Sequence, residues 1–260
     1  MNLEKNRQHW GEGYAWKEEG EEWSRAWGGA AMQWHGGLLR RIFPFLPTGH
    51  LLEIAPGLGR WTQFLLPQCE QYTGIEIAQK CVDHCKQRFS GASHASFHLT
   101  DGVTMPAEAN SVDFVFSFDS LVHADRATIE GYLKELARVF TADGVAFVHH
   151  SNLAAVDSAW VPTKDAHLRD ASVSAAWARV TAEAVGLCCA GQEISTWGRE
   201  DPYPIDCVSL FTRPGSRWAR PTVTLHSDLW LERALVRKLA AAYGPASFSK
   251  DPAVRERARP

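Results

Sequence analysis

Side chains that can take up a proton follow two apolar runs of the sequence. Asp119 and His123 come after the first run, and His149 and His150 end the second. A carboxylate or an imidazole in such a place can act as a general base and remove the proton of an attacking hydroxyl. Because neighbouring residues of a strand point to opposite faces, only one of His149 and His150 is expected to face a substrate. The pattern predicts proton-transfer chemistry where two strands end.

A second group of candidate residues surrounds a glycine-bearing turn. Residues 51–60 read LLEIAPGLGR, in which Glu53 ends an apolar run and Gly57 and Gly59 precede a new helical pattern. In a doubly wound α/β sheet, ligands bind outside the carboxyl ends of the strands at such a turn. Glu76 ends the next predicted strand, where a carboxylate accepts hydrogen bonds from both ribose hydroxyls. The pattern predicts a nucleotide-type cofactor.

The turn itself distinguishes between two cofactors. A dinucleotide site requires G-x-G-x-x-G, with amides at a helix N-terminus directed at a pyrophosphate. Here Ala55 stands where the first glycine belongs, and no third glycine follows at the required spacing. A nicotinamide-dependent oxidoreductase is therefore disfavoured, and S-adenosylmethionine is the expected cofactor.

Residues 53–59 resemble motif I of the class I S-adenosylmethionine-dependent methyltransferases, whose usual form is an acidic residue followed by G-x-G-x-G. Over residues 10–243 the chain is also similar to a bacterial subgroup of sugar O-methyltransferases that includes the methylmannose polysaccharide methyltransferases of actinobacteria. The runs that carry this resemblance are EEWS at 21–24, AWGG at 26–29, GRWTQF at 59–64, FSFDSLVH at 116–123 and HHSNL at 149–153. The resemblance implies methyl transfer to a hydroxyl of a sugar or glycosylated metabolite.

The resemblance also implies which residues contact the cofactor. Asp101 is expected to accept the exocyclic amine of adenine, and a plain Asp-Gly turn is the alternative for this pair. The expected cofactor contacts are Glu53, Ala55, Gly57, Gly59, Trp61, Thr62, Glu76, Asp101, Gly102, Ser117 and Phe118.

The acceptor is expected to meet aromatic and polar side chains. Tryptophans of the N-terminal region lie among the glutamates of residues 18–22, a combination that binds carbohydrates or cations by stacking and cation–π contact. The alternative is that these rings only anchor the N-terminal arm. The expected acceptor contacts are Trp23, Trp27, Asn152, His167 and Arg169. N-methylation of an aminosugar or other small amine is the alternative reaction, and a non-catalytic cofactor-binding protein is the alternative outside enzymes.

Two routes would remove the proton of a sugar hydroxyl. In the first, His149 or His150 takes it directly. In the second, Mg²⁺ held by oxygen ligands, with Asp119 as the first candidate, polarises the hydroxyl and a histidine assists. His123 is a further catalytic candidate, and its alternatives are a cofactor contact or a place at the edge of the core.

Hydrophobic periodicity predicts the elements that position these residues. We expect a Rossmann-like α/β sheet, mostly parallel with an antiparallel last strand, and helices on both faces. An aromatic and acidic arm with a helix covers residues 1–47, and the cofactor-binding domain covers 48–260 with a lid insertion at about 153–173 and a C-terminal helix. Strands are expected from about 50, and at 72–76, 95–99, 111–117, 145–148, 192–197 and 206–212. Helices are expected at 36–47, 61–66, 78–89, 127–140, 174–185 and 228–243.

Composition limits the class of protein. A chain of 260 residues with 45% hydrophobic content can bury a sizeable core within one decorated domain. A net charge of −3 gives no basic surplus for nucleic acid or an anionic membrane. The first residues form no apolar signal segment, and no run of eighteen apolar residues occurs, so a cytoplasmic protein is expected. A small saccharide or glycoside is the expected partner, and no oligomeric state is predicted.

Overall fold

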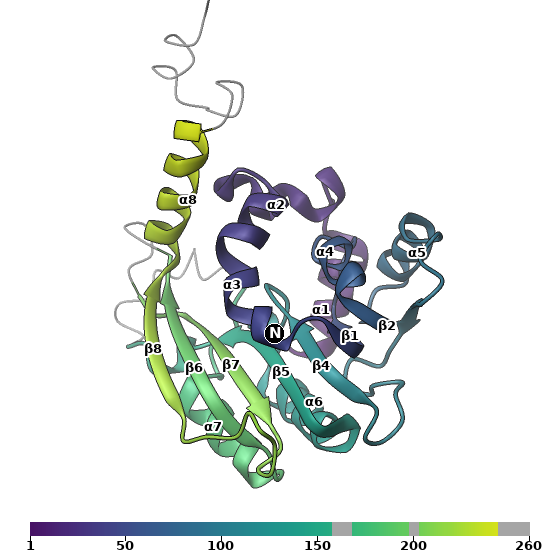
Figure 1. The fold of residues 1–260 in the computed structure, drawn as a ribbon, viewed down its shortest axis with the longest axis vertical. Coiled ribbons are helices and arrows are strands. Elements are labelled where there is room, and N and C mark those ends of the chain that lie inside the picture. The colour runs from purple at the N-terminus through teal and green to yellow at the C-terminus, as the bar shows by residue number, and fades with distance from the viewer. Residues whose placement is uncertain (158–167, 198–202, 244–260) are drawn as a thin grey trace, which may run out of the picture.

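The computed structural model describes residues 1–157, 168–197 and 203–243, in which eight strands form one sheet (Figure 1). The spatial order is β3-β2-β1-β4-β5-β7-β6-β8. The first five strands of this order, from β3 to β5, run parallel to one another. β7 is antiparallel to β5 and β6, and β8 is parallel to β6. The strands are β1 (Thr48–Ile54), β2 (Cys69–Glu76), β3 (Ala95–Leu99), β4 (Val112–Ser117), β5 (Phe140–Ser151), β6 (Cys188–Thr196), β7 (Asp206–Thr212) and β8 (Val223–Asp228).

Helices connect the strands and precede the sheet. The α-helices are α1 (Leu3–Gln8), α2 (Ala30–Gln33), α3 (Leu39–Ile42), α4 (Thr62–Leu65), α5 (Gln79–Arg88), α6 (Arg126–Val139), α7 (Ala175–Ala184) and α8 (Leu229–Tyr243). Short 3-10 or π segments are η1 (His9–Gly13), η2 (Glu18–Trp27), η3 (Trp34–Leu38), η4 (Phe43–Phe45), η5 (Leu66–Gln68), η6 (Leu121–His123) and η7 (Leu153–Ala155). The predicted α/β sheet with helices on both faces is confirmed.

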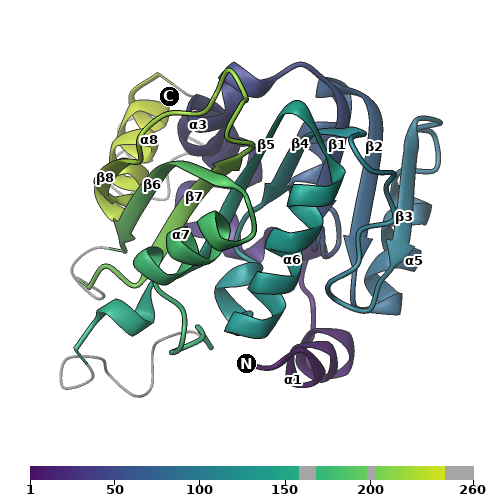
Figure 2. The ribbon, with the colours of Figure 1, turned by 90° about the horizontal axis from the view of Figure 1, so that it is seen from below.

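Two apolar cores lie on the two faces of the sheet. Helices α6 and α7 cover one face (Figure 2), where Leu133 and Ala178 pack on strand residues such as Val148. On the other face, helical segments from α2 to α5 pack on residues such as Phe116 and Phe147. Alternate residues of β4 and β5 therefore enter opposite cores, as a strand buried on both faces requires. This alternation fixes the face toward which each side chain at the end of β5 points.

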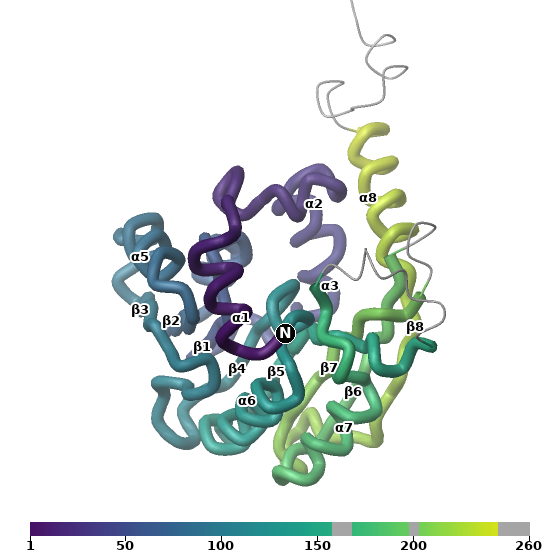
Figure 3. Tube along the Cα trace, turned by 180° about the vertical axis from the view of Figure 1, so that it is seen from behind, coloured from purple at the N-terminus to yellow at the C-terminus, as the bar shows by residue number. Residues whose placement is uncertain are grey.

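The start of the chain lies across the carboxyl ends of the central strands. Helix α1 passes over this edge (Figure 3), and the side-chain amide of Asn6 donates to the carbonyl of His123 at 3.0 Å. Behind α1, the rings of Trp10, Tyr14, Trp16 and Trp23 contact one another with centroid distances of 5.1–6.4 Å. The expected aromatic N-terminal region is thus a packed cluster above the strand ends.

The C-terminal part adds a strand that the sequence pattern did not predict. β8 follows β7 in the chain and pairs with β6 in parallel. The antiparallel strand is β7, so it is the second to last strand and not the last one that the sequence pattern predicted. Helix α8 follows β8 directly and projects from the body of the domain (Figure 1). No helix of the described residues has the length and apolar character needed to cross a membrane. The predicted lid at 153–173 falls in large part on 158–167, outside the described residues.

Candidate functional site

The turn after β1 has the backbone that a ligand-binding loop requires. Ala55, Gly57 and Gly59 have φ of 57°, 60° and 90°, all in the left-handed region that favours glycine. A Cβ on Gly59 would lie 2.4 Å from Cε2 of Phe89. Gly59 is therefore needed for close packing of the turn on the segment that follows α5.

Glu53 precedes this turn and is held by hydrogen bonds inside the protein. Its buried carboxylate accepts hydrogen bonds from Oγ1 of Thr62 at 2.7 Å and from the hydroxyl of Tyr72 at 2.5 Å. Burial raises the pKa of Glu53 to about 7. Glu53 and Thr62 therefore tie the end of β1 to the start of α4, and they shape the expected cofactor site from within the protein.

Glu76 ends β2 and faces the same turn. One carboxylate oxygen accepts from the amides of Ile77 and Ala78 at 2.7 and 3.1 Å, and the other accepts from the amide of Gly57 at 3.1 Å. Burial raises its pKa, against the lowering effect of these hydrogen bonds. The carboxylate lies where a ribose is expected, and its hydrogen bonds connect the end of β2 with the turn after β1.

The N-terminal arm fills the space beside the turn glycines. A Cβ on Gly57 would lie 3.0 Å from the ring of Trp16, and a Cβ on Gly102 would lie 2.2 Å from Leu3. The buried Oγ of Ser117 and Nε1 of Trp61 have no hydrogen-bond partner among the described residues. The acidic group of Glu76 and the unpaired polar atoms fit S-adenosylmethionine, and a bound cofactor would take the space that Trp16 and Leu3 fill here.

Asp101 forms the Asp-Gly turn that was the alternative to an adenine contact. Its carboxylate accepts from the amides of Thr104 and Val103 at 2.7 and 2.9 Å and from the hydroxyl of Thr104 at 2.7 Å. The hydrogen bonds of Thr104 lower its pKa. The side chain closes an Asp-Gly turn, and this use of both oxygens leaves the adenine contact as a proposal without support from its present geometry.

Asp119 and His149 belong to a chain of charged groups. Nη2 of Arg60 lies 2.8 Å from one oxygen of Asp119, and the other oxygen lies 3.3 Å from Nδ1 of His149. On the far side of the ring, Nε2 lies 3.4 Å from Oδ2 of Asp206. Nε of Arg169 lies 2.6 Å from the other oxygen of Asp206, and the indole of Trp197 donates to the same carboxylate at 2.5 Å. The imidazole therefore lies between two carboxylates, each held by an arginine.

The protonation of His149 follows from these neighbours. Burial would lower its pKa, but the charges and hydrogen bonds of Asp206 and Asp119 outweigh burial and raise the pKa to about 9. The charged ring donates to both carboxylates. The neutral ring keeps its proton on Nε2 and accepts at Nδ1 from the backbone N–H of Asp119, which lies 3.1 Å away. Nδ1 cannot do both, so the ring has two distinct hydrogen-bond arrangements.

His150 and His123 do not join this chain. His150 points into the opposite core, where Nδ1 contacts the carbonyl of Ser151 at 2.8 Å and Nε2 the hydroxyl of Ser209 at 2.8 Å. Burial lowers the pKa of His150 to about 4 and that of His123 also to about 4. The ring of His123 packs on Trp10 at a centroid distance of 5.0 Å. Both rings thus take part in packing or hydrogen bonds away from Asp119, and their predicted catalytic roles stay predictions.

The expected acceptor contacts are divided among different surroundings. Asn152 is engaged by backbone, since its amide donates to the carbonyl of Pro204 at 2.7 Å and accepts from the amide of Ala175 at 2.8 Å. Arg169 is paired with Asp206, and Trp23 stacks on Tyr14 with 45% of its surface exposed. Trp27 is 3% exposed and lines a pocket beside His149. His167 lies outside the described residues.

Several residues of the site escaped the sequence analysis. Arg60 follows Gly59 directly, and its positive charge beside an expected cofactor turn was a signal that could have been used. Asp206 and Gln33 carried no local signal, because only the pairing of β7 with β5 and the packing of α2 bring them to the site. Long-range pairing is invisible in a single sequence.

Metal binding finds no support in this geometry. Asp119, the first candidate ligand, already contacts the guanidinium of Arg60 at 2.8 Å, which would oppose a cation at the same oxygen. Among the residues that the structure describes, no group of three or more His, Cys, Asp or Glu side chains could hold a metal ion. We therefore derive no step through Mg²⁺.

Comparison with known proteins identifies the fold. A family model described as a methyltransferase domain matches residues 51–144, and no curated protein matches the chain. An S-adenosylmethionine-dependent methyltransferase from Leishmania major is similar in structure, with 14% identity, 80% of this chain and 82% of that chain covered, and a TM-score of 0.59. A TehB-like methyltransferase from Corynebacterium glutamicum has 20% identity, coverages of 74% and 97%, and a TM-score of 0.51.

A protein with a different reaction shares the same fold. The [4+2]-cyclase SpnF is 17% identical, with coverages of 70% and 80% and a TM-score of 0.54. At these identities the structures establish the fold alone, and none of the comparisons addresses the sugar subgroup. Residues 51–144 therefore match a methyltransferase domain, and the described chain shares its fold with solved S-adenosylmethionine-dependent methyltransferases.

Proposed function

We propose that this protein transfers a methyl group from S-adenosylmethionine to a hydroxyl of a sugar or of a glycosylated metabolite. The observation that carries the proposal is the carboxylate of Asp119, which follows the end of β4, is 24% exposed, and lies 3.3 Å from the buried ring of His149. An attacking hydroxyl must lose its proton, so it requires a proton-accepting pair of this kind within reach.

In the proposed reaction, Asp119 accepts a hydrogen bond from the acceptor hydroxyl and takes its proton. Neutral His149 then takes the proton at Nδ1, and the charge of Asp206 stabilises the imidazolium that forms. Arg60 holds Asp119, and Phe118 stacks on the imidazole at a centroid distance of 4.5 Å, which restricts rotation of the ring. The cofactor, when bound, supplies a sulfonium methyl group as the electrophile.

The charges around His149 make its neutral form accessible in the loaded enzyme. Arg60, Asp119, Asp206 and Arg169 carry no net charge together, so the cluster is neutral when the imidazole is neutral. A positive charge bound nearby disfavours the imidazolium. We therefore expect cofactor binding to lower the pKa of His149 below its value in the free protein.

N-methylation of an aminosugar or other small amine is the second candidate. The observation that favours it is the raised pKa of His149, which leaves the ring mostly protonated at neutral pH and unable to accept a further proton. A neutral amine attacks without a base, and the Asp119 carboxylate could then bind the ammonium product. The two candidates differ in their need for a proton acceptor.

The test is methyl transfer from labelled S-adenosylmethionine to a panel of mannosides, other neutral glycosides and aminosugars, each with and without a chelator. The proposal expects labelled product of the correct mass from a neutral glycoside, and the chelator arm tests the Mg²⁺ route directly. Product from aminosugars alone would replace the O-methyl proposal by the N-methyl one. No product from any acceptor would remove the sugar as substrate.

The role of His149 is tested by His149→Gln, with His150→Gln as the matched control. Both residues are buried on β5, and they point into opposite cores. Loss of a general base typically lowers turnover by about 10²- to 10⁴-fold. We expect a loss of that order for His149→Gln with no loss of cofactor affinity, and a far smaller loss of turnover for His150→Gln. Equal losses in the two variants would contradict the assignment.

A further inference from the structure

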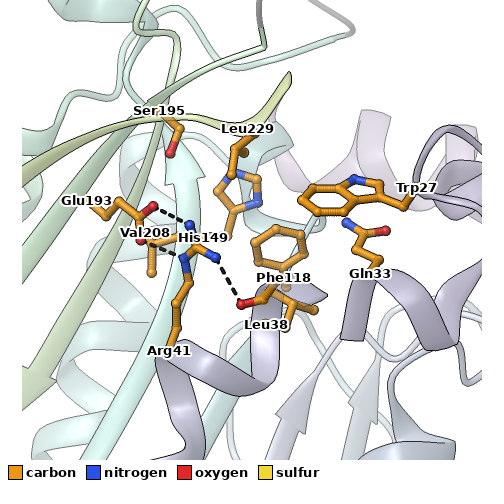
Figure 4. A pocket seen from close by; sticks show the side chains of 11 residues that line it. Trp27, Gln33, Leu38, Arg41, Phe118, His149, Glu193, Ser195, Val208 and Leu229 are labelled. Carbon is orange, nitrogen blue, oxygen red and sulfur yellow. Dashed lines mark hydrogen bonds and ion pairs between the residues drawn. The ribbon is translucent and has the colours of Figure 1, made fainter. Parts of the chain in front are cut away.

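A small pocket lies beside His149. It is bounded by the N-terminal helical segments, by the ends of β4 and β5, and by the C-terminal strands (Figure 4). Its free volume is about 10 Å³, which admits about one water molecule or hydroxyl group. The residues that line it are Trp27, Gln33, Gly37, Leu38, Arg41, Phe118, His149, Glu193, Ser195, Val208 and Leu229.

The side chain of Gln33 brings unused hydrogen-bonding capacity to this pocket. Gln33 ends α2, is 2% exposed, and lies between Trp27 and Phe118 in Figure 4. Its buried Oε1 accepts no hydrogen bond from the described residues. A buried amide oxygen without a donor costs about 1–3 kcal/mol, which a ligand with a donor would recover. Rotation about the last side-chain bond presents either the oxygen or the NH₂ group, and a hydroxyl matches both.

The charged side chains of the pocket are fully engaged with one another. Nε and Nη2 of Arg41 donate to Glu193 at 2.7 and 2.6 Å, and Nη1 and Nη2 donate to Glu232 at 2.8 Å each. Nη1 also donates to the carbonyl of Gly37 at 2.9 Å, so all five donors of the guanidinium have acceptors. Arg40 pairs with Glu232 as well, and these two arginines balance the two glutamates. The other ionisable side chain of the lining, His149, lies between the carboxylates of Asp119 and Asp206, so each charge of the pocket is balanced by a neighbour within the protein.

We propose that this pocket binds one uncharged hydroxyl-bearing substituent of the methyl acceptor, with Gln33 as the specificity-determining residue. Trp27 and Phe118 supply apolar walls beside the hydroxyl, because a free volume of about 10 Å³ admits the substituent and leaves the ring that carries it outside. The inference rests on the proposed function for the identity of the bound molecule as the acceptor. Ligand recognition itself does not require that methyl transfer occurs.

The test measures binding to protein saturated with S-adenosylhomocysteine, so that no turnover is needed. Saturation-transfer NMR and calorimetry are applied with methyl α-mannopyranoside as the neutral ring, glucosamine as the cationic ring and glucuronate as the anionic ring. We expect saturable binding of the neutral ring and weaker binding of both charged rings. Absence of neutral-ring binding, or stronger binding of a charged ring, overturns the proposal.

Three variants connect the binding to Gln33. Gln33→Leu removes the amide and is expected to weaken neutral-ring binding about tenfold, as loss of one hydrogen bond does. Gln33→Glu adds a charge and is expected to move the preference toward glucosamine. Gln87→Leu, at an exposed position of α5, is the matched control and should behave as the wild type. Unchanged neutral-ring affinity in Gln33→Leu would mean that the pocket holds only water, and would overturn the proposal.

The readouts separate the two proposals. S-adenosylhomocysteine affinity and melting temperature are measured for every variant, since an apolar residue in place of an unpaired buried acceptor should leave folding intact. If binding depends on Gln33 but no hydroxyl is methylated, the proposed reaction fails and the pocket inference stands. If a neutral glycoside is methylated with the same acceptor KM in Gln33→Leu, the pocket inference fails and the proposed reaction stands.

Discussion

The pKa of His149 is open to a direct test, because it depends on one residue that touches neither expected substrate. Asp206 makes the largest favourable contribution to the charged ring, with its Oδ2 3.4 Å from Nε2. A pKa of about 9 leaves only about 1% of the imidazole neutral at pH 7. If neutral His149 is the final proton acceptor, kcat/KM for S-adenosylmethionine, which reports the pKa values of the free enzyme, rises tenfold per pH unit and levels near pH 9.

Asp206→Asn should move this inflection by at least about one pH unit toward neutral pH. Without the Asp206 charge, burial lowers the pKa of His149 and only Asp119 still raises it, so the pKa should fall from about 9 toward the usual value of 6.5. The inflection in kcat/KM then moves in the same direction. A weaker base also transfers protons less readily, so the plateau is expected below that of the wild type. The position of the inflection is therefore the readout.

The substitution also carries a cost for folding. Arg169 is 8% exposed, and the substitution removes the carboxylate charge that faces it at 2.6 Å, a change in a buried ion pair that costs about 3–5 kcal/mol. The double variant Arg169→Gln with Asp206→Asn removes both charges, and it should be more stable than the single variant. Circular dichroism and melting temperature report folding, and pH–rate profiles are recorded for all three proteins. An inflection that stays near pH 9 in both variants would refute the assignment of the titrating group.

Two further predictions concern the turn and the arm. Gly59→Ala places a Cβ 2.4 Å from Phe89 at a φ of 90°, so it should lower the free energy of unfolding by roughly 2–4 kcal/mol. The control Gly91→Ala has no atom within 4 Å of its Cβ and should change the free energy of unfolding little. Equal melting temperatures of the two variants would contradict this prediction. S-adenosylhomocysteine should change the tryptophan fluorescence as Trp16 leaves Gly57, and Trp16→Phe should lose most of this change while Trp218→Phe keeps it; a full signal in Trp16→Phe would show that the ring stays in place.

The elements that could be predicted from the sequence are those whose own residues show a clear apolar periodicity. β3 and β7 were expected at the residues where they occur, and α6 and α7 differ by one residue at each end, because apolar periodicity and cap residues mark them. β8 escaped because it is an exposed edge strand with little alternation, and Leu225 is 59% exposed. Its position depends on pairing with β6, which the sequence of β8 alone does not encode.

The candidate site was predictable only as far as strand ends define it. Asp119 and His149 were expected together because parallel strands end at one edge, and they lie 3.3 Å apart. The separation of His149 from His150 followed from strand alternation. Asp206 could not be assigned, since its contact with His149 arises from an antiparallel register in which Ser151 faces Asp206. The group that sets the pKa of His149 is therefore a product of topology.

The shared fold does not decide the reaction, because the cyclase SpnF has it as well. What distinguishes one reaction from another must lie in side chains near the strand ends. For an O-methyltransferase, the decisive feature is a group that is basic enough to hold a proton and neutral often enough to accept one. His149 is basic enough because Asp206 and Asp119 raise its pKa. Its neutral form is favoured when the cationic cofactor binds, because the two arginines and two aspartates around it already carry no net charge. An amine acceptor needs neither condition, so the pH dependence of the loaded enzyme distinguishes the two reactions.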